Sequence, residues 1–260
     1  EISLGLVGSE MCIRDSFNGG KMDKTIGRLN ERTLHLTLKN MLEPDPAFHE
    51  VKYLGYVADI KRGNEIIEIE TRSFANLRKK LDAFLEDCTV TLVYPVACPK
   101  YVVWVDPVTG ELSEKRKSPK KGRPSDISFE LYRLRGYLGR PGFSLKIITL
   151  EMTDYRRRDG WSRDGKRGAV RIERIPGAVS SVLDISSPQD YRMLADVILD
   201  GEFTAAEFAA ANRMKPRYAW YLLSILCSVA VISKCGKRGR ADLYTAVPDG
   251  SEPAFQHSDG

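Results

Sequence analysis

The sequence has 260 residues, of which 42% are hydrophobic and 29% are charged, values that are ordinary for a folded globular protein. This composition excludes a chain that is disordered along most of its length, and no apolar run reaches the roughly 18 to 20 residues that a membrane-spanning helix needs. The formal net charge is +5. The five cysteines form no CxxC pair and the three histidines are scattered, which argues against a disulfide framework or a zinc site and favours a reducing, cytoplasmic location without membrane association.

The first residues differ in character from the rest. Residues 1–16 (EISLGLVGSEMCIRDS) resemble translated sequencing-adapter read-through, and they lack the positive start and the small-residue cleavage site of a secretory signal. We therefore expect residues 1–21 to be a non-native leader and Met22 to be the true start.

The chain after this leader alternates between helical and strand-like patterns. Asn30 can cap a helix whose leucines share one side, and two prolines then end it. β-Branched runs indicate strands, and Ser73 can cap the next helix. In chain order, the pattern predicts a helix at 30–42, strands at 51–60 and 65–71 around a turn at 61–64, a helix at 74–87, and strands at 89–96 and 101–105.

Two basic segments interrupt the second half. Residues 111–124 and 153–174 show no hydrophobic period, so both are predicted to be loops. Between them, residues 127–138 have a helical pattern and residues 145–152 a strand pattern. The order helix, two strands, helix, strand predicts an α/β sandwich.

The composition changes near Ser186. A helical stretch at 186–201 precedes a capping-box pattern of Thr204 and Glu207, which opens a short helix. A helix at 215–229 and a hairpin over 231–247 complete a winged helix-turn-helix pattern, which we assign to residues 186–248. A small helical cap that packs on the main domain is the alternative. Residues 249–260 have little to bury, and we expect a mobile tail.

The hairpin around residues 61–64 carries three acids. Pairing Ile60 with Glu65 places Asp59, Glu68 and Glu70 on one face and turns Ile67 and Ile69 toward the following helix. Carboxylates placed in this way can share a cation such as Mg²⁺. A half-exposed strand that carries acids for solubility would show the same alternation, and it remains the alternative.

This arrangement resembles the PD-(D/E)XK nuclease core. Asp59 matches the aspartate of that motif, Glu68 its second acid, and Glu70 the position usually held by lysine, whose positive charge a glutamate does not supply. The resemblance implies a restriction-endonuclease-like α/β/α core with a mixed sheet over residues 22–180, and Mg²⁺ or Mn²⁺ bound by Asp59, Glu68 and Glu31. It further implies a phosphodiesterase in which Glu70 and Lys61 assist, or else a non-catalytic DNA-binding regulator. The span 30–247 also resembles an uncharacterised bacterial family that joins such a core to a C-terminal winged helix.

Positive charge is concentrated in the middle of the chain. Residues 114–167 hold sixteen Lys and Arg against seven Asp and Glu, an excess of nine that leaves the rest of the chain at −4. This asymmetry predicts a polyanionic partner, for which we expect duplex DNA; the quaternary structure, a homodimer included, is left open. A solvated basic loop is the alternative. The predicted DNA contacts are Lys115, Arg116, Lys117, Lys120, Lys121, Arg123, Arg157, Arg163, Lys166, Arg167, Lys215, Arg217, Tyr218, Lys237, Arg238 and Arg240.

Overall fold

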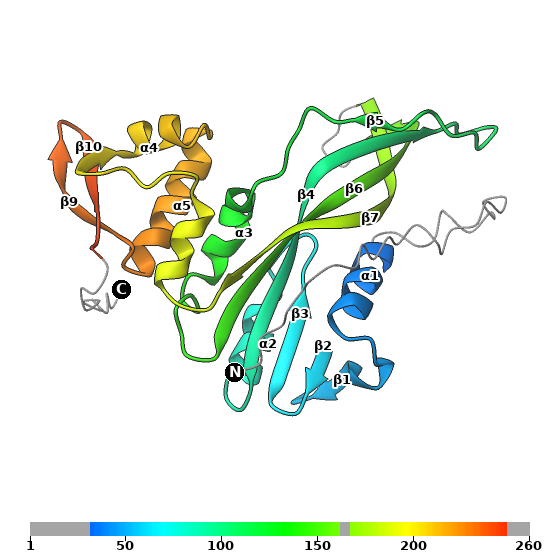
Figure 1. Cartoon of the computed structure of the whole chain (residues 1–260), viewed down its shortest axis with the longest axis horizontal. Helices are drawn as coiled ribbons and strands as arrows, with labels where there is room; N and C mark the ends of the chain where they lie inside the picture. The colour runs from blue at the N-terminus through cyan, green and yellow to red at the C-terminus, as the bar shows by residue number, and fades with distance from the viewer. Residues whose placement is uncertain (1–31, 162–166, 249–260) are drawn as a thin grey trace.

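A computed structural model describes residues 32–161 and 167–248 of the chain. Within these ranges the chain has a mixed α/β fold, with one large mixed sheet, one small sheet and helices on both faces of the large sheet (Figure 1). The first part contains α1 (Arg32–Leu42), a 3-10 turn η2 (Pro46–Phe48), β1 (His49–Tyr53), β2 (Tyr56–Arg62), β3 (Glu65–Ile69), α2 (Arg78–Phe84) and β4 (Thr89–Val105).

The later elements continue the large sheet and then build the small one. They are β5 (Arg116–Lys117), η3 (Pro124–Ile127), α3 (Ser128–Leu131), η4 (Tyr132–Leu134), β6 (Phe143–Trp161), β7 (Arg167–Ile185), η5 (Gln189–Leu194), β8 (Glu202–Thr204), α4 (Ala205–Ala211), α5 (Pro216–Ser228), β9 (Ile232–Arg238) and β10 (Ala241–Ala246).

The large sheet has the order β1-β2-β3-β4-β6-β7, with β5 attached to β4. Strands β1, β2 and β3 form an antiparallel meander, whereas β3, β4 and β6 run parallel and β7 returns antiparallel to β6. A parallel neighbour requires a crossover connection, which α2 supplies between β3 and β4. This arrangement places the acidic hairpin inside the sheet, next to β4.

Separate hydrophobic clusters cover the two faces of this sheet. On one face, Leu34 and Leu38 of α1 pack with Ile67 and Ile69 of β3. On the other face, α2 and α3 contribute to a larger core that includes Ile66. The prediction that Ile67 and Ile69 face the following helix is therefore wrong, because α1, the preceding helix, covers them.

The pairing of the hairpin differs from the prediction by two residues. Ile60 lies opposite Ile67 and Arg62 opposite Glu65, so the turn is only Gly63-Asn64. Gly63 adopts a φ of 53°, a left-handed conformation that glycine tolerates and that a tight turn uses. The shorter turn shifts Glu68 from a diagonal position to one directly across from Asp59.

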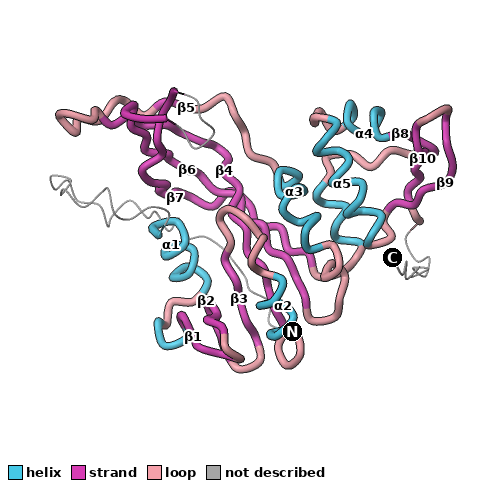
Figure 2. The backbone as a smooth tube through the Cα atoms, turned by 180° about the vertical axis from the view of Figure 1, so that it is seen from behind, coloured by secondary structure: helices cyan, strands magenta, loops and turns pink. Residues whose placement is uncertain are grey.

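The predicted basic loop at 153–174 is largely two strands. β6 and β7 extend 19 residues each, well past the hydrophobic core, and their ends form a long hairpin (Figures 1 and 2). The prediction failed because the outer hairpin is held by backbone hydrogen bonds and not by buried apolar side chains, so it leaves no hydrophobic period in the sequence.

The C-terminal part contains α4, α5 and the three-stranded sheet β8-β10-β9. The predicted capping box is confirmed: Glu207 N–H donates to Thr204 Oγ1 and Thr204 N–H donates to Glu207. The predicted helical stretch at 186–201 is only the 3-10 helix η5. No helix in the two described ranges is long and apolar enough to cross a membrane.

The C-terminal part shares one hydrophobic core with the main sheet. Leu222 and Leu226 of α5 are fully buried in the same cluster as Ile127 and Leu131, which flank or belong to α3. The two parts are therefore joined by continuous packing and not only by a linker.

Candidate functional site

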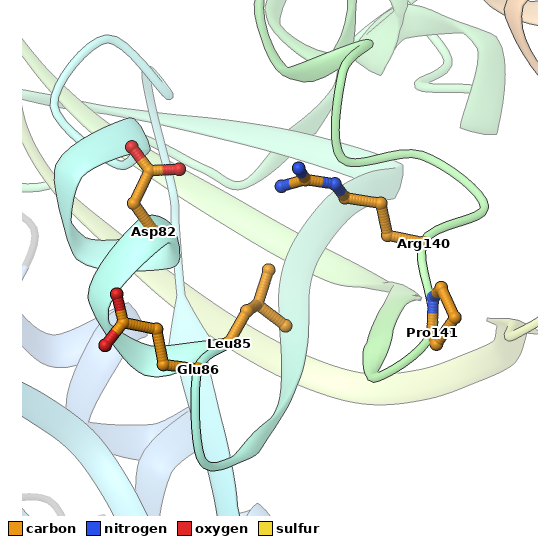
Figure 3. A pocket seen from close by; sticks show the side chains of 5 residues that line it. All are labelled: Asp82, Leu85, Glu86, Arg140 and Pro141. Atoms are coloured by element: carbon orange, nitrogen blue, oxygen red, sulfur yellow. The ribbon is translucent and has the colours of Figure 1, made fainter.

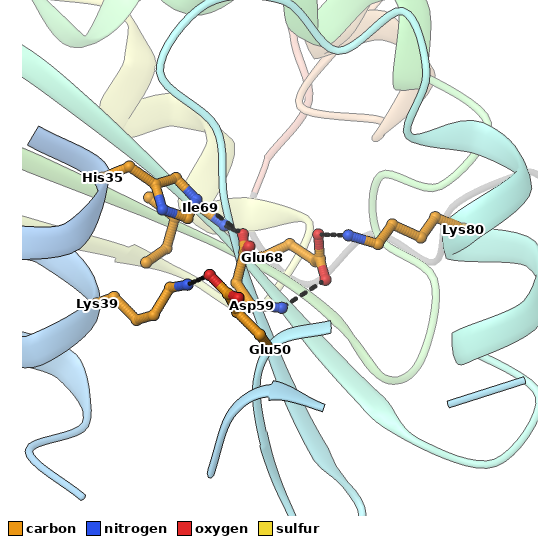
Figure 4. Close-up of polar contacts among 7 residues, drawn as sticks. All are labelled: His35, Lys39, Glu50, Asp59, Glu68, Ile69 and Lys80. Carbon is orange, nitrogen blue, oxygen red and sulfur yellow. Dashed lines mark hydrogen bonds and ion pairs between the residues drawn. The ribbon is translucent and has the colours of Figure 1, made fainter. Parts of the chain in front are cut away.

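Two of the three acids predicted from the sequence, Asp59 and Glu68, lie close together near the end of β3 (Figure 4). Asp59 lies on β2, Glu68 on β3, and Glu70 directly after β3. The backbone N–H of Asp59 donates to Glu68 Oε1 at 3.3 Å, and the backbone N–H of Ile69 donates to Asp59 Oδ2 at 2.8 Å. These reciprocal bonds across the hairpin fix both carboxylates on rigid backbone.

Asp59 and Glu68 each contact a basic side chain, and the two basic side chains come from different helices. His35 of α1 lies with Nε2 3.2 Å from Asp59 Oδ2, and Lys80 of α2 lies with Nζ 2.5 Å from Glu68 Oε2. Figure 4 shows the two acids between the helices, Asp59 toward α1 and Glu68 toward α2. Because α1 and α2 cover opposite faces of the sheet, the two acids take their nearest partners from opposite faces and not from the single face that the sequence predicted.

Lys80 is a residue of this site that the sequence pattern did not indicate. It brings an ammonium group to Glu68 from the following helix. The helical pattern carried a signal for it, since Lys80 lies three residues after Leu77 and four before Phe84, both buried.

The burial of the acids shifts their protonation. Burial, followed by the negative charge of Asp59, raises the pKa of Glu68 to about 7. Burial and the charges of Asp59 and Glu68 likewise raise the pKa of Glu70 to about 7. Burial opposes ionisation of Asp59 as well, but the contacts with His35 and the N–H of Ile69 outweigh it and lower the pKa of Asp59. One acid is thus held ionised while the other two are poised near neutrality.

A second ion pair borders the site on the α1 side. The ammonium of Lys39, itself buried, lies 2.9 Å from Glu50 Oε1, and this contact lowers the pKa of Glu50 (Figure 4). Glu50 is therefore occupied by its own partner and does not belong to the acid group.

The donor set limits how a metal ion could bind. Among residues 32–161 and 167–248, no group of three or more His, Cys, Asp or Glu side chains is arranged to hold a metal ion. Glu31, the predicted further ligand, lies outside the described residues. The carboxylates of Asp59 and Glu68 remain as possible ligands, and the backbone N–H of Asp59 donates to Glu68 Oε1. A pair of carboxylates fits the way Mg²⁺ binds together with substrate phosphates.

Lys61, predicted to assist catalysis, is not brought to the acids. Its ammonium donates to the carbonyl of Gly63 in the hairpin turn and lies 4.4 Å from the centre of the Tyr53 ring. The two-residue turn explains this position, because it makes Lys61 part of β2, with its side chain directed along the strand toward the turn.

The predicted DNA contacts of the first basic segment separate into two groups. Lys115 pairs with Glu151 at 2.6 Å and lies over Tyr101, while Arg116, Lys117, Lys120 and Lys121 are exposed. Arg123 turns inward instead. Its guanidinium donates to Asp196 Oδ2 at 2.7 Å and to the carbonyls of Asn212 and Arg213 at 2.8 and 3.1 Å, so it ties this segment to the C-terminal part.

The second basic segment is only partly described. Arg157 is half-buried on β6 and Arg167 begins β7, whereas Arg163 and Lys166 lie outside the described residues. The described part of this segment on β6 pairs with β4, and β5 pairs with the other edge of β4, so the two basic segments of the sequence share one end of the sheet.

The predicted contacts of the C-terminal part have mixed surroundings. Lys215 stands at the N-cap of α5, and the guanidinium of Arg217 lies over the rings of Phe129 and Tyr221, where α5 meets α3. Tyr218 is exposed, as are the residues of the β9–β10 turn, although Arg238 also pairs with Glu207 at 2.8 Å. The predicted contacts exposed at that turn are Lys237, Arg238 and Arg240.

A cavity of about 400 Å³ lies beside the C-terminal end of α2 (Figure 3). It is lined by Asp82, Leu85 and Glu86 from α2 and the residues after it, and by Arg140 and Pro141 before β6. None of the predicted site residues lines it, and it therefore plays no part in the proposed chemistry.

Comparison with known proteins assigns the chain to a family. The family model described as "Domain of unknown function (DUF8091)" matches residues 32–186, and the chain belongs to this family. The chain is also similar to an "Uncharacterized protein" of Treponema pallidum (strain Nichols), with 28% identity over 247 residues that cover 91% of this chain and 94% of that protein. No solved structure matches the chain.

Proposed function

We propose that the protein is a nuclease-like hydrolase that cleaves phosphodiester bonds in DNA with the help of Mg²⁺ or Mn²⁺. The observation that carries this proposal is the pairing of Asp59 with Glu68 across the hairpin, with Lys80 and Glu70 beside them. The order α1, hairpin, α2, β4 supports a PD-(D/E)XK-like, restriction-endonuclease-like core. The order α4, α5, β9–β10 supports a winged helix as a second DNA-binding unit.

Asp59 and Glu68 would hold the metal ion. When bound, such an ion polarises a phosphoryl oxygen and lowers the pKa of a bound water. His35 and the N–H of Ile69 keep Asp59 ionised and oriented. Glu70, whose pKa of about 7 matches neutral conditions, would accept a proton from the attacking water.

Lys80 would stabilise the charge that develops on the phosphate. Its ammonium already lies at the acids, held against Glu68 at 2.5 Å. A cation placed beforehand where negative charge develops stabilises the transition state without reorganisation. In this proposal Lys80 takes the role that lysine at position 70 would have in the motif.

Plasmid nicking tests the proposal. The protein should convert supercoiled plasmid to open circles in Mg²⁺ or Mn²⁺ and not in EDTA. Asp59→Asn and Glu68→Gln should reduce this to background, and Glu70→Gln should slow it by about 10²-fold or more, as expected for loss of a general base. Glu86→Gln, a change at an exposed acid that follows α2, should leave the rate unchanged. The absence of metal-dependent cleavage on duplex and single-stranded substrates would reject hydrolysis.

A non-catalytic DNA-binding regulator is the second candidate. The observation that favours it is the ion pair between Glu68 and Lys80, which gives the buried acid a partner without any metal. This candidate predicts salt-sensitive duplex binding that Asp59→Asn does not change and that Lys215→Gln weakens.

A further inference from the structure

A cluster of buried charges occupies the sheet beyond the acids. Asp154 of β6 is fully buried, and its carboxylate lies 2.6 Å from Lys100 Nζ of β4, 3.0 Å from Arg156 Nη2 and 3.8 Å from Arg174 Nε of β7. We call Lys100, Arg156 and Arg174 the cation cluster.

The cluster carries more positive than negative charge. Three cations contact the single carboxylate of Asp154, so two positive charges remain in excess within the group. The register places Asp154 directly opposite Arg174.

Several groups of the cluster have incomplete partners. Arg156 Nε and Asp154 Oδ1 are buried and make no hydrogen bond within the described chain. Burial lowers the pKa of Arg174. The cluster nevertheless reaches the surface, because the side chains of Lys100, Arg174 and Arg156 are 17%, 20% and 32% exposed.

The cluster adjoins the acids. Arg174 Nη1 donates to the carbonyl of Thr71 at 3.4 Å, and Thr71 follows Glu70 in the chain. The cluster therefore contacts the segment that directly follows the acids.

We propose that the cation cluster binds a phosphate group of a nucleic acid backbone, with Arg156 and Arg174 as its principal donors. Guanidinium groups match the geometry of phosphate oxygens and bind them through paired hydrogen bonds. Asp154 holds the cations in place when no phosphate is bound. The inference rests on the proposed function in that it takes nucleic acid as the ligand, but it does not require cleavage.

Binding measured without metal separates the two ideas. Fluorescence anisotropy with a labelled duplex in EDTA should show that Arg156→Gln and Arg174→Gln weaken binding by about tenfold each and reduce the salt dependence by about one unit of slope. Lys146→Gln is the matched control: it removes one positive charge from β6, at a lysine that pairs with Asp184 near the other end of the strand. This control should change the affinity by less than about twofold.

The melting temperature of a third variant tests the proposal even if an arginine variant fails to fold. Asp154→Asn removes the only carboxylate of the cluster, so it should lower the melting temperature, and inorganic phosphate should restore it more than chloride at equal ionic strength. Equal restoration by the two salts would contradict phosphate binding. So would arginine variants that bind duplex DNA as Lys146→Gln does.

The two proposals can fail separately. Weakened binding of the arginine variants together with no cleavage in Mg²⁺ or Mn²⁺ would reject the hydrolase and leave the phosphate site standing. Cleavage of plasmid by a wild-type protein whose binding is insensitive to Arg156→Gln and Arg174→Gln would do the reverse.

Discussion

Glu68 is held in a position that suits a carboxylate only when a cation is nearby. It is 1% exposed, it faces the charge of Asp59, and its main compensation is the ammonium of Lys80. A buried acid of this kind favours its neutral form, because burial in a low-dielectric interior disfavours charge. A cation bound beside Glu68 would therefore favour its ionised form.

This burial predicts a pH dependence of stability in EDTA. The pKa of Glu68 is about 7 in the folded chain and has an ordinary value of 4.5, so the folded state binds the proton more tightly. The stabilisation by this proton is complete below about pH 4.5 and is lost as the pH rises through 7, by roughly 2 to 3 kcal/mol. Denaturation in guanidinium chloride at pH 5 and pH 8 measures the loss.

Glu68→Gln supplies the comparison. The amide cannot ionise, so the variant should lose less stability than the wild type between pH 5 and pH 8, whereas Glu86→Gln should behave as the wild type does. Parallel pH profiles for wild type and Glu68→Gln would show that Glu68 is ionised in the folded chain throughout this range.

Lys80 shows what the sequence could not provide at this scale. The identities of Asp59, Glu68 and Glu70 followed from alternation along two strands, which is a local property. The contribution of Lys80 depends on how α2 packs over β3, a long-range property that the sequence pattern does not specify. For the same reason the sequence pattern indicated Lys61 as the catalytic cation. Lys61 is close to Asp59 in the chain, but its ammonium is directed to the hairpin turn.

Lys80→Met tests this reassignment. Removal of the ammonium should slow plasmid nicking by at least about tenfold while the affinity for duplex DNA in EDTA changes little, because the proposed role is exerted in the transition state. Lys61→Met, which removes an equal charge at the turn, should leave nicking near the wild-type rate. An equal effect of both changes would argue against a specific role for Lys80.

The segment 111–124 acts as a connector between the two parts of the molecule. It starts beside β4 and ends with Arg123, whose guanidinium binds Asp196 and two carbonyls after α4. Gly122 fits closely here, since a Cβ atom at this position would lie 2.7 Å from the carbonyl oxygen of Ala97. The sequence predicted this stretch as a DNA-binding loop, but its residue Arg123 makes a structural contact with the C-terminal part.

Arg123→Gln should therefore lower stability and not DNA affinity. Loss of three charge-assisted hydrogen bonds at a half-buried site should cost about 1 to 3 kcal/mol, measured by chemical denaturation. Lys121→Gln changes the same charge two residues earlier at an exposed position and should alter stability by less than about 0.5 kcal/mol. A loss of DNA affinity at unchanged stability would contradict this prediction and would indicate that Arg123 contacts DNA.

Elements with buried faces were predicted far better than elements outside the core. α1, α4, α5 and the C-terminal hairpin lie close to their predicted residues, because their apolar faces leave a period in the sequence. The outer parts of β6 and β7 carry charged residues on both faces and give no such signal. The helix predicted at 127–138 is broken into the short elements α3 and η4, with a 3-10 turn before them.

At the scale of the whole molecule, one continuous core joins the large sheet to α5. Leu222 is fully buried within the cluster that also includes Leu131 of α3. Continuous packing of this kind makes unfolding cooperative across both parts. The sequence change near Ser186 marks a change of local pattern, but it does not mark a gap in the packing.

Calorimetry tests this cooperativity. The chain should unfold in a single transition, and Leu222→Ala should shift that whole transition by a destabilisation of about 2 to 5 kcal/mol, as for other buried leucines. Leu112→Ala, at a leucine that is 46% exposed, should shift it little. Two transitions, of which only one moves, would show that the parts unfold independently.

The anchoring of Arg123 also bears on how such a chain can change over generations. A recombination event that kept residues up to 186 and exchanged the rest would leave this guanidinium half-buried without its carboxylate, and would open the apolar surface of α3. A replacement would be tolerated only if it supplied an acid and two free carbonyls at the same places. We therefore expect the two parts to be inherited as a pair, and substitutions at Asp196 to accompany substitutions at Arg123.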